Sequence, residues 1–392
     1  MRIGYYAHHH GSGHCRQADK IAALLPPHLQ QQLIVFTSLP EESYRFTTIK
    51  EDQIIRLSNE DELADDVLVG RAGQYWQPSS LHYSPVGNKD IQTRSWQLLD
   101  TIKQRQIDLM LIDVSVEVSM LCRVASVPYL YVRLPGERDD IPHIGAFTGA
   151  LGILAPYPRA LEAAATSDWV RQKTLYLDFL ATTASNPLSS AEFLSYLASL
   201  APSTAPFLDK NATLPFIVTV IKGYGGHQAI DDKLATLREI LPSAFIISLG
   251  PIDDHARQCV DIATEVDEVS AFIAHSDLLV MATGLNSIAQ VYQWQTPLVV
   301  LPDERPHREQ EVMAEALIAQ GRALSWEQFL AQTAASKEDD NALHAASGEQ
   351  YSLDNESNIA AQKFVDSIVA YDTVKSWFQE WLLPQLAVDV EI

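Results

Sequence analysis

The chain opens with Met1-Arg-Ile-Gly-Tyr-Tyr-Ala7, continues through His8-His-His-Gly-Ser-Gly-His14 and leads into Cys15-Arg-Gln-Ala-Asp-Lys-Ile-Ala-Ala-Leu-Leu25. The apolar, aromatic run at the start predicts a buried strand, and apolar side chains of the third segment recur at helical spacing. Gly11 and Gly13 allow the tight turn that such a connection needs. We therefore expect a strand, a glycine turn and a helix whose N-terminal N–H groups point at a ligand, with His14 on the rim.

Length and composition limit the class of protein. The 392 residues predict two domains, and a content of 47% hydrophobic and 20% charged residues is ordinary for a globular enzyme. The net charge of -22 argues against nucleic acid and anionic membrane surfaces as partners, because both reward clustered Lys and Arg. An anionic ligand held by backbone N–H groups is compatible with this charge.

Cysteine usage and hydropathy bear on the compartment. Cys15, Cys122 and Cys259 are far apart and have neither metal-ligand nor disulfide spacing, which fits a reducing compartment. The N-terminus reads as a strand rather than a signal peptide, and no apolar run approaches the roughly 18 residues of a membrane-spanning helix. We expect a cytoplasmic protein without an integral membrane segment.

Strand and helix signals alternate through the first half. Apolar runs that predict strands lie at residues 33–37, 53–57, 109–113, 129–134, 152–155 and 175–179. Helical patterns at residues 92–105 and 116–125 separate some of them, which predicts a parallel sheet covered on both faces. Residues 58–91 are polar, acidic and broken by prolines, so we expect a long loop or lid-like insertion there.

The alternation stops at residues 181–213, which are rich in Thr, Ser, Pro and Ala, and we place an inter-domain linker there. It restarts with strand signals at residues 216–221, 244–249, 278–282, 298–301 and 323–325, followed by helical spacing at 358–381. The fold class is therefore α/β, with two Rossmann-like, doubly wound parallel-sheet domains facing across a cleft. We assign residues 1–205 and 206–355 to the two domains and 356–392 to C-terminal helices.

In such sheets, ligands bind beyond the carboxyl ends of the strands. The segments at the strand ends are His8–His14, Asp113–Glu117 and Arg133–His143 in the first half, and Gly223–His227, Thr283–Gln290 and Asp303–Gln310 in the second. A single glycine loop could equally reflect helix–strand packing. Two such loops at matching places in two similar halves favour a ligand site.

These segments carry a family resemblance. Gly11-Ser-Gly-His14 resembles the acceptor-side glycine loop of GT-B glycosyltransferases, most closely those related to the peptidoglycan N-acetylglucosaminyltransferase. Gly223-Tyr-Gly-Gly-His-Gln-Ala229 resembles their second glycine loop. Thr283-Gly-Leu-Asn-Ser-Ile-Ala-Gln-Val-Tyr-Gln-Trp-Gln-Thr-Pro-Leu-Val-Val-Leu-Pro302 and Arg308-Glu-Gln-Glu-Val-Met-Ala314 resemble the donor-binding block, the most specific part of the likeness. The resemblance covers most of the chain in order and spacing.

The resemblance implies a GT-B fold and a nucleotide-sugar-dependent transferase of hexosyltransferase type, inverting and independent of metal. The nucleotide-sugar would be a substrate rather than a cofactor. A UDP-sugar is the first candidate, and the identity of the nucleobase is left open. The acceptor could be a small molecule, a glycan or a lipid-linked molecule, and the oligomeric state is not specified. The C-terminal helices would cross back onto the first domain.

The expected catalytic residues are His14 as the base, with Asp113 and Glu117 as alternatives, and Asp113 could instead orient His14 or anchor a helix. The expected contacts to the donor and its diphosphate are Gly11, Gly13, Gly225, Gly226, His227, Gly284, Asn286, Ser287, Gln290, Glu309 and Gln310. No metal site is expected, because His8, His9 and His10 leave a strand in different directions.

Two positions depart from the family pattern. Gln290 stands where the family places a Glu for the ribose hydroxyls, and His227 stands where Ser is more usual. An amide can bind a diol but loses the charge-assisted hydrogen bond, which leaves the donor's identity open. Two alternatives therefore remain: a nucleotide-sugar 2-epimerase-like enzyme, and a non-catalytic nucleotide-sugar binding protein on the same fold.

Overall fold

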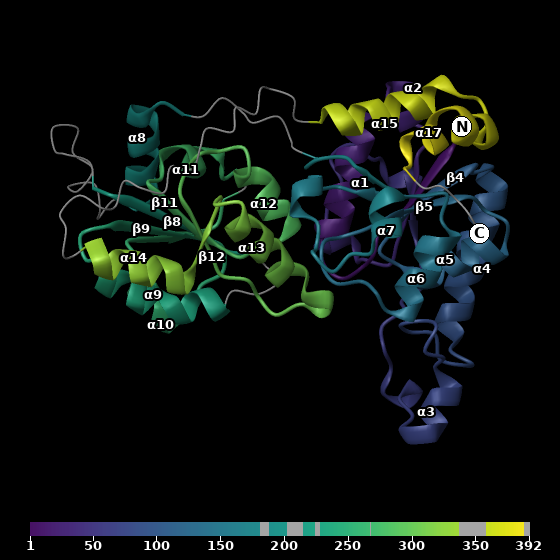
Figure 1. Ribbon diagram of the computed structural model, residues 1–392, viewed down its shortest axis with the longest axis horizontal. Coiled ribbons are helices and arrows are strands. Elements are labelled where there is room, and N and C mark those ends of the chain that lie inside the picture. Colours follow the sequence, from purple (N-terminus) through teal and green to yellow (C-terminus); the bar gives the residue numbers. More distant parts are fainter. Residues whose placement is uncertain (181–187, 202–214, 224–227, 267, 337–357, 388–392) are drawn as a thin grey trace. The chain divides into compact units, whose positions relative to one another are not determined.

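The computed structural model describes residues 1–180, 188–201, 215–223, 228–266, 268–336 and 358–387. The chain divides into two compact units, each built around one parallel sheet (Figure 1). The first unit is formed by the described residues of Met1–Arg159, Ala164–Leu180 and Ser357–Ile392, and the second by those of Ala160–Ala163 and Ala181–Glu356.

The first sheet has seven parallel strands in the order β3-β2-β1-β4-β5-β6-β7. Their bounds are β1 Ile3–Tyr6, β2 Ile34–Thr37, β3 Ile54–Arg56, β4 Leu109–Asp113, β5 Tyr129–Val132, β6 Gly152–Ala155 and β7 Thr174–Tyr176. In β1, β2, β4, β5 and β6 every residue is buried. Both faces of this sheet are therefore covered, which is why its strands read as continuous apolar runs.

Helices α1 Gly13–Leu24, α4 Lys89–Arg105, α5 Val116–Val124 and α6 Ile141–Gly149 pack on the two faces. The first unit also contains α2 Pro27–Gln30, α3 Gly70–Trp76 and α7 Asp168–Gln172, and the short 3-10 turns η1 Glu41–Ser43, η2 Glu51–Gln53 and η3 Ala64–Asp66. The turn η4 Arg159–Leu161 begins at the last residue of this part of the first unit and continues into the second. Tyr5 packs in one core cluster with side chains of α1, whereas the next residue, Tyr6, packs in the other with side chains of α4, α5 and α6. The alternation of side chains along a strand produces these two cores.

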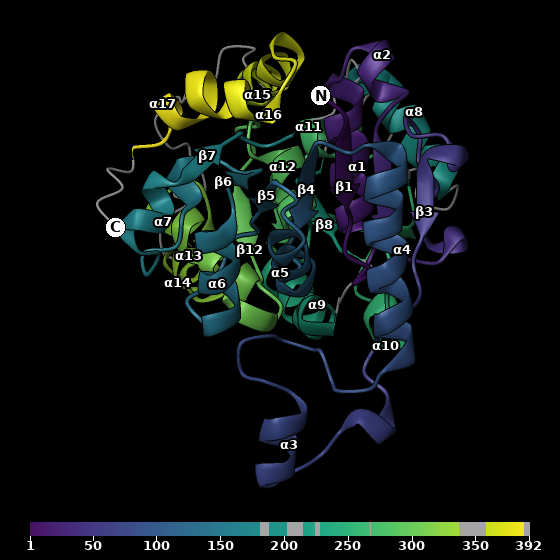
Figure 2. The same cartoon turned by 90° about the vertical axis from the view of Figure 1, so that its right-hand side faces the viewer.

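The C-terminal segment packs on the first sheet's α1 side (Figure 2). It comprises α15 Ile359–Ala370, α16 Val374–Trp377, the π-helical turn η8 Phe378–Leu382 and α17 Leu383–Gln385. Trp377 is fully buried there, and its indole N–H donates to Ser367 Oγ at 2.9 Å. The aromatic stripe of this segment is therefore core packing.

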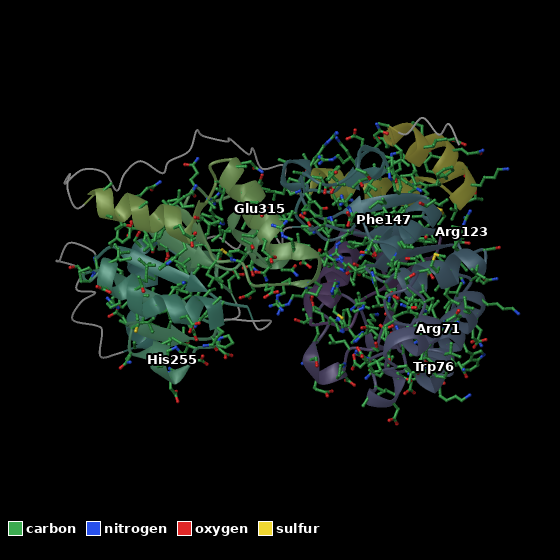
Figure 3. The ribbon with its side chains drawn as sticks, turned by 60° about the horizontal axis from the view of Figure 1, so that its bottom comes forward. Arg71, Trp76, Arg123, Phe147, His255 and Glu315 are labelled. Atoms are coloured by element: carbon green, nitrogen blue, oxygen red, sulfur yellow. The ribbon has the colours of Figure 1, made fainter. Side chains whose placement is uncertain are left out.

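The insertion between β3 and α4, residues 58–88, is called the arm below. We expected a long loop or lid-like insertion over residues 58–91. The structure gives this insertion the 3-10 turn η3 and the helix α3, which project away from the sheet of their own unit (Figure 2), and α4 begins at Lys89. Arg71 and Trp76 mark α3 in Figure 3.

The second sheet has six parallel strands in the order β10-β9-β8-β11-β12-β13. Its strands are β8 Ile217–Ile221, β9 Phe245–Leu249, β10 Ile262–Thr264, β11 Leu278–Met281, β12 Leu298–Val300 and β13 Leu324–Ser325. Its helices are α8 Ser190–Leu200, α9 Gln228–Ile240, α10 Asp254–Arg257, α11 Ser270–His275, α12 Leu285–Val291, α13 Glu309–Ala319 and α14 Trp326–Ser336, with the 3-10 turn η6 Pro306–Arg308. These six strands have the same order as β3-β2-β1-β4-β5-β6 of the first sheet. In each sheet the strand order therefore reverses at one point, between β1 and β4 in the first and between β8 and β11 in the second.

Two elements of the second unit differ from expectation. We expected a linker over residues 181–213 and a first domain reaching residue 205, but α8 belongs to the second unit, where Phe193 packs edge-on against Phe272 of α11 at 5.4 Å. A reciprocal capping box between Ser189 and Glu192 starts α8. The strand β10 was also missed, because its sequence, Ile262-Ala-Thr264, has no run of large apolar residues.

Candidate functional site

The carboxyl ends of β1 and β4, the point where the first sheet reverses its strand order, bring together His14 and Asp113. His14 Nδ1 lies 2.9 Å from Asp113 Oδ2, and the buried Tyr5 hydroxyl donates to the same oxygen at 3.1 Å. Gly11 makes the turn before α1, with a φ of +82° and its N–H donating to the His9 carbonyl at 2.8 Å. This turn sets the first residues of α1 over the end of β4.

The burial of Asp113 determines what this pair can do. Its side chain is fully buried, whereas that of His14 is 12% exposed. A carboxylate at Nδ1 holds the imidazole in the tautomer that carries its lone pair on Nε2. The histidine can then accept a proton at Nε2, and the carboxylate stabilises the resulting imidazolium.

His9 joins the same loop to the arm. Its Nδ1 lies 3.0 Å from Glu60 Oε1 and its Nε2 lies 2.6 Å from Asp61 Oδ1. Burial lowers the pKa of His9, but the hydrogen bonds and charges of the two carboxylates outweigh it and raise the pKa above its ordinary value. Burial likewise opposes ionisation of Glu60, yet bonds from His9, Arg94 and Tyr6 lower its pKa to about 2.

The three consecutive histidines offer ligand atoms within 4.8 Å of one another. However, the His8 ring stacks on the His9 ring with an interplanar angle of 21°, and both His9 nitrogens face carboxylates. Because both His9 nitrogens are already engaged by Glu60 and Asp61, this histidine presents no free ring nitrogen to an ion. The absence of a metal from the reaction stays a prediction.

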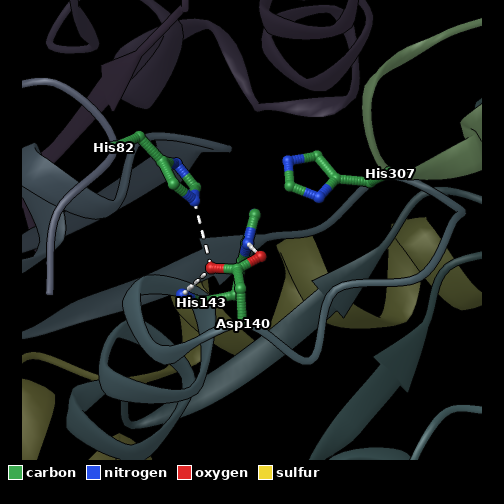
Figure 4. Close-up of side chains that lie close together, drawn as sticks. All are labelled: His82, Asp140, His143 and His307. Atoms are coloured by element: carbon green, nitrogen blue, oxygen red, sulfur yellow. Dashed lines mark hydrogen bonds and ion pairs between the residues drawn. The ribbon is translucent and has the colours of Figure 1, made fainter. Parts of the chain in front are cut away.

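A second polar group lies at the N-terminus of α6 (Figure 4). Asp140 caps the helix, with its Oδ1 3.1 Å from His82 Nε2 and its Oδ2 2.6 Å from His143 Nδ1. His143 is 1% exposed, and burial together with the neighbouring Arg138 guanidinium lowers its pKa to about 3. The strand-end segment from Arg133 to His143 thus ends in a helix cap that holds a neutral histidine.

Glu117, the alternative base, is engaged by the arm. Its Oε1 accepts the backbone N–H groups of His82 at 2.7 Å and Tyr83 at 3.1 Å. These bonds favour an anchoring role for Glu117.

In the second unit, Gln310 ties three elements together. Its Oε1 accepts N–H groups of Thr283 at 3.3 Å and Asp303 at 2.9 Å, and its main-chain carbonyl accepts the Thr283 hydroxyl at 2.6 Å. This buried side chain therefore fixes the ends of β11 and β12 to α13, and its contact with a ligand stays a prediction. Glu309, beside it in the first turn of α13, is half-buried.

The turn at Gly284 starts α12. Ile288 and Val291 are fully buried and belong to the core, whereas Asn286 is half-buried and Gln290 is exposed. Asn286 and Gln290 are four residues apart on one face of the helix. Ser287 is half-buried in its first turn. Gly225, Gly226 and His227 lie outside the described residues, and their role stays a prediction.

One buried ion pair at the end of β8 had not been expected. Lys222 Nζ lies 2.6 Å from Asp231 Oδ1, both side chains are fully buried, and Asp231 Oδ2 accepts the Asp253 N–H at 2.8 Å. Gly250 has a φ of +97°, and a Cβ there would lie 2.6 Å from the Lys222 carbonyl oxygen. A lysine directly after an apolar strand and an aspartate in the next helix were the available signal.

No protein-family model and no curated protein sequence matches the chain. Solved structures do match it over nearly its whole length. MurG of Acinetobacter baumannii is 12% identical, with a TM-score of 0.59 over 95% of this chain and 100% of MurG. The spinosyn rhamnosyltransferase SpnG complexed with thymidine diphosphate is 15% identical, with a TM-score of 0.54 over 94% of this chain and 96% of SpnG.

The fold is GT-B. The glycosyltransferase SsfS6 of Streptomyces sp. SF2575, also complexed with thymidine diphosphate, is 13% identical, with a TM-score of 0.52 over 98% of this chain and 99% of SsfS6. Identities this low establish the shared GT-B fold alone. Within it, none of the described helices combines the length and hydropathy needed to cross a membrane.

Proposed function

We propose that this GT-B protein is a metal-independent, inverting glycosyltransferase that moves a sugar from a nucleotide-sugar to an acceptor hydroxyl, with His14 as the base. The observation that carries the proposal is the 2.9 Å contact between His14 Nδ1 and Asp113 Oδ2 at the strand-order reversal of the first sheet. Ligands of doubly wound sheets bind beyond this edge.

His14 Nε2 takes the proton of the acceptor hydroxyl while that oxygen attacks the anomeric carbon of the donor sugar. The bond from that carbon to the diphosphate oxygen breaks on the opposite face, so configuration inverts and the nucleoside diphosphate leaves with the electron pair. Asp113 positions His14 and stabilises its imidazolium, and Tyr5 holds the Asp113 carboxylate in place.

We assign the donor to the second unit. The leaving diphosphate needs fixed N–H groups, which glycine turns at helix starts supply. The predicted contacts are Gly284, Asn286, Ser287 and Gln290 around α12, with Glu309 and the amide nitrogen of Gln310 reaching the sugar hydroxyls. The neighbours solved with thymidine diphosphate, SpnG and SsfS6, support a nucleoside diphosphate here and make thymidine a candidate nucleoside of the donor beside uridine.

Binding is tested by the melting temperature with uridine, thymidine, guanosine and adenosine diphosphates and their sugars. At least one nucleoside diphosphate and its nucleotide-sugar should raise the melting temperature, because a ligand bound only by the native state stabilises that state. Glu309→Gln should weaken binding of the nucleotide-sugar but not of the bare diphosphate, whereas Glu304→Gln, at an exposed position nearby, should change neither. No shift with any nucleotide would overturn the donor assignment, and an equal loss for both ligands would overturn the sugar contact.

A further inference from the structure

The arm exposes a concentrated set of apolar side chains. Val69 is 84% exposed and Tyr75 is 75% exposed, and Leu63, Val67, Leu68 and Val86 are also exposed. They come from α3 and the two chain segments beside it, at the projecting end marked by Arg71 and Trp76 in Figure 3. Apolar residues gathered on one projecting element, rather than scattered singly, are typical of an interaction surface.

The arm holds its conformation through its own bonds. The Asp66 carboxylate accepts the Tyr83 hydroxyl at 2.8 Å and the Asn88 amide at 2.8 Å, which ties the outgoing segment to the returning one. The Val86 N–H donates to the Trp76 carbonyl at 3.2 Å. The exposed apolar side chains therefore belong to an insertion whose conformation is fixed by its own hydrogen bonds.

The charge of the arm limits the class of partner that can bind it. The arm carries five carboxylates, all within residues 60–66, and one arginine, Arg71, whose guanidinium lies over the Tyr75 ring at 5.7 Å from its centroid. Glu62 and Asp65 are exposed beside the exposed Leu63 and Val67. An anionic bilayer is repelled by such a surface, whereas an apolar face bordered by Lys or Arg is complementary to it.

The arm's backbone indicates how the partner binds. The arm, all of whose residues the structure describes, has no strand, so it offers no sheet edge to which an extended peptide could add. Its contacts must come from side chains of a helix and two loops, the arrangement that accepts the apolar face of another helix. We propose that the arm docks a basic amphipathic helix of a partner protein.

The end of the arm nearest the sheet adjoins the loop that carries His14, the proposed catalytic base. Glu60 and Asp61 bond His9, and Glu117 anchors the backbone of His82 and Tyr83. The docking surface is therefore fixed to the same edge of the sheet as His14. The docking proposal does not depend on glycosyl transfer, so either can fail alone.

The test measures fluorescence anisotropy of a labelled peptide of about 18 residues, five helical turns, with lysines on one face and leucines on the other. The doubly substituted Val69→Ser/Tyr75→Ser protein and the doubly substituted Glu62→Gln/Asp65→Asn protein should each bind about tenfold more weakly than the unmodified chain, a loss of about 1.4 kcal/mol. Matched controls are Val124→Ser, 82% exposed on α5, and Glu41→Gln/Glu42→Gln on η1, which should bind as the unmodified chain does.

Four results would overturn the proposal. Equal losses in the arm and control variants would show non-specific attraction to an acidic protein. A peptide with glutamates in place of lysines that binds as well would remove the charge argument. Vesicles of phosphatidylcholine that bind the arm and displace the peptide would indicate a lipid surface. Self-association in sedimentation that Val69→Ser abolishes would indicate a second copy of this chain.

Discussion

Single residues at the sheet edges are set in defined protonation states by burial and by their partners. His9 lies between two carboxylates that favour its charged form, whereas His143 lies buried beside Arg138, which favours its neutral form. The sequence allowed His14 and Asp113 to be paired, because both follow apolar strands that adjoin in a doubly wound sheet. It could not reveal that Glu117 anchors the arm or that Gln310 ties strand ends, because their partners are backbone N–H groups, which every residue type except proline carries.

Asp113→Asn tests the positioning of the proposed base. The amide keeps the size of the side chain but can present a donor to His14 Nδ1, which favours the wrong tautomer. We expect kcat to fall by about 10²–10⁴ with nucleotide binding unchanged. Steady-state kinetics beside calorimetric titration of the nucleoside diphosphate separates the two. A loss of nucleotide affinity with unchanged kcat would contradict the role assigned to Asp113.

His143 predicts an acid-sensitive stability. Its pKa is about 3 in the folded chain, well below the ordinary histidine value, so the unfolded chain binds more protons once the pH falls below that ordinary value. Stability is therefore present above about pH 6.5 and is lost toward the folded pKa, with a slope of at most about 1.4 kcal/mol per pH unit. Urea unfolding of wild type and His143→Gln between about pH 7 and pH 5 should show the gap between them narrowing as the pH falls. His28→Gln, at an exposed position, is the control. A difference in stability between wild type and His143→Gln that stays constant with pH would rule out His143 as the source of the acid sensitivity.

At the scale of elements, the strands were predictable and the exceptions have physical causes. Fully buried parallel strands are continuous apolar runs, and the sequence marks them because helices cover both faces. The edge strand β10 lacks such a run, and α8 lies in a Ser- and Ala-rich segment where only the Ser189–Glu192 capping box marks its start. The fold of the arm could not be predicted, because its bonds join Asp66 to Tyr83 and Asn88 across two segments.

The Lys222–Asp231 pair joins β8 to α9, and Asp231 also holds the Asp253 backbone. Lys222→Met leaves a buried carboxylate without its counter-ion and should lower the free energy of unfolding by about 3–5 kcal/mol. Adding Asp231→Leu removes that charge, so the double variant should recover part of the loss. Chemical denaturation of the single and double variants measures the coupling. Additive losses would show that the two groups do not act as a pair.

At the scale of the whole molecule, each unit has its own core. The core clusters of the first unit include Phe364 and Trp377 from the C-terminal segment, whereas that of the second unit is built around β8, β9, β11 and β12. The C-terminal residues are therefore part of the first unit's stability although they follow the second in sequence. That both halves form doubly wound parallel sheets was predictable from the repeated alternation of strand and helix signals.

Trp377→Ala should destabilise one unit selectively. Removing this fully buried indole should cost about 3–5 kcal/mol, and hydrogen exchange should accelerate in β1 and β4 but not in β8 and β11. Trp96→Ala, 65% exposed on α4, should have little effect. Equal acceleration in both sheets would show that the two units unfold together.

Sugar transfer from a nucleotide-sugar, with His14 as the base, can be measured as product release. The most direct measurement is the rate of nucleoside diphosphate release from uridine and thymidine diphosphate sugars, with pooled hydroxyl acceptors, by wild type and His14→Ala. We predict acceptor-dependent release by wild type, about 10²–10⁴ times slower release by the variant, and equal nucleotide binding by both. Release that needs no acceptor, that is absent from wild type, or that is unchanged in His14→Ala would contradict it.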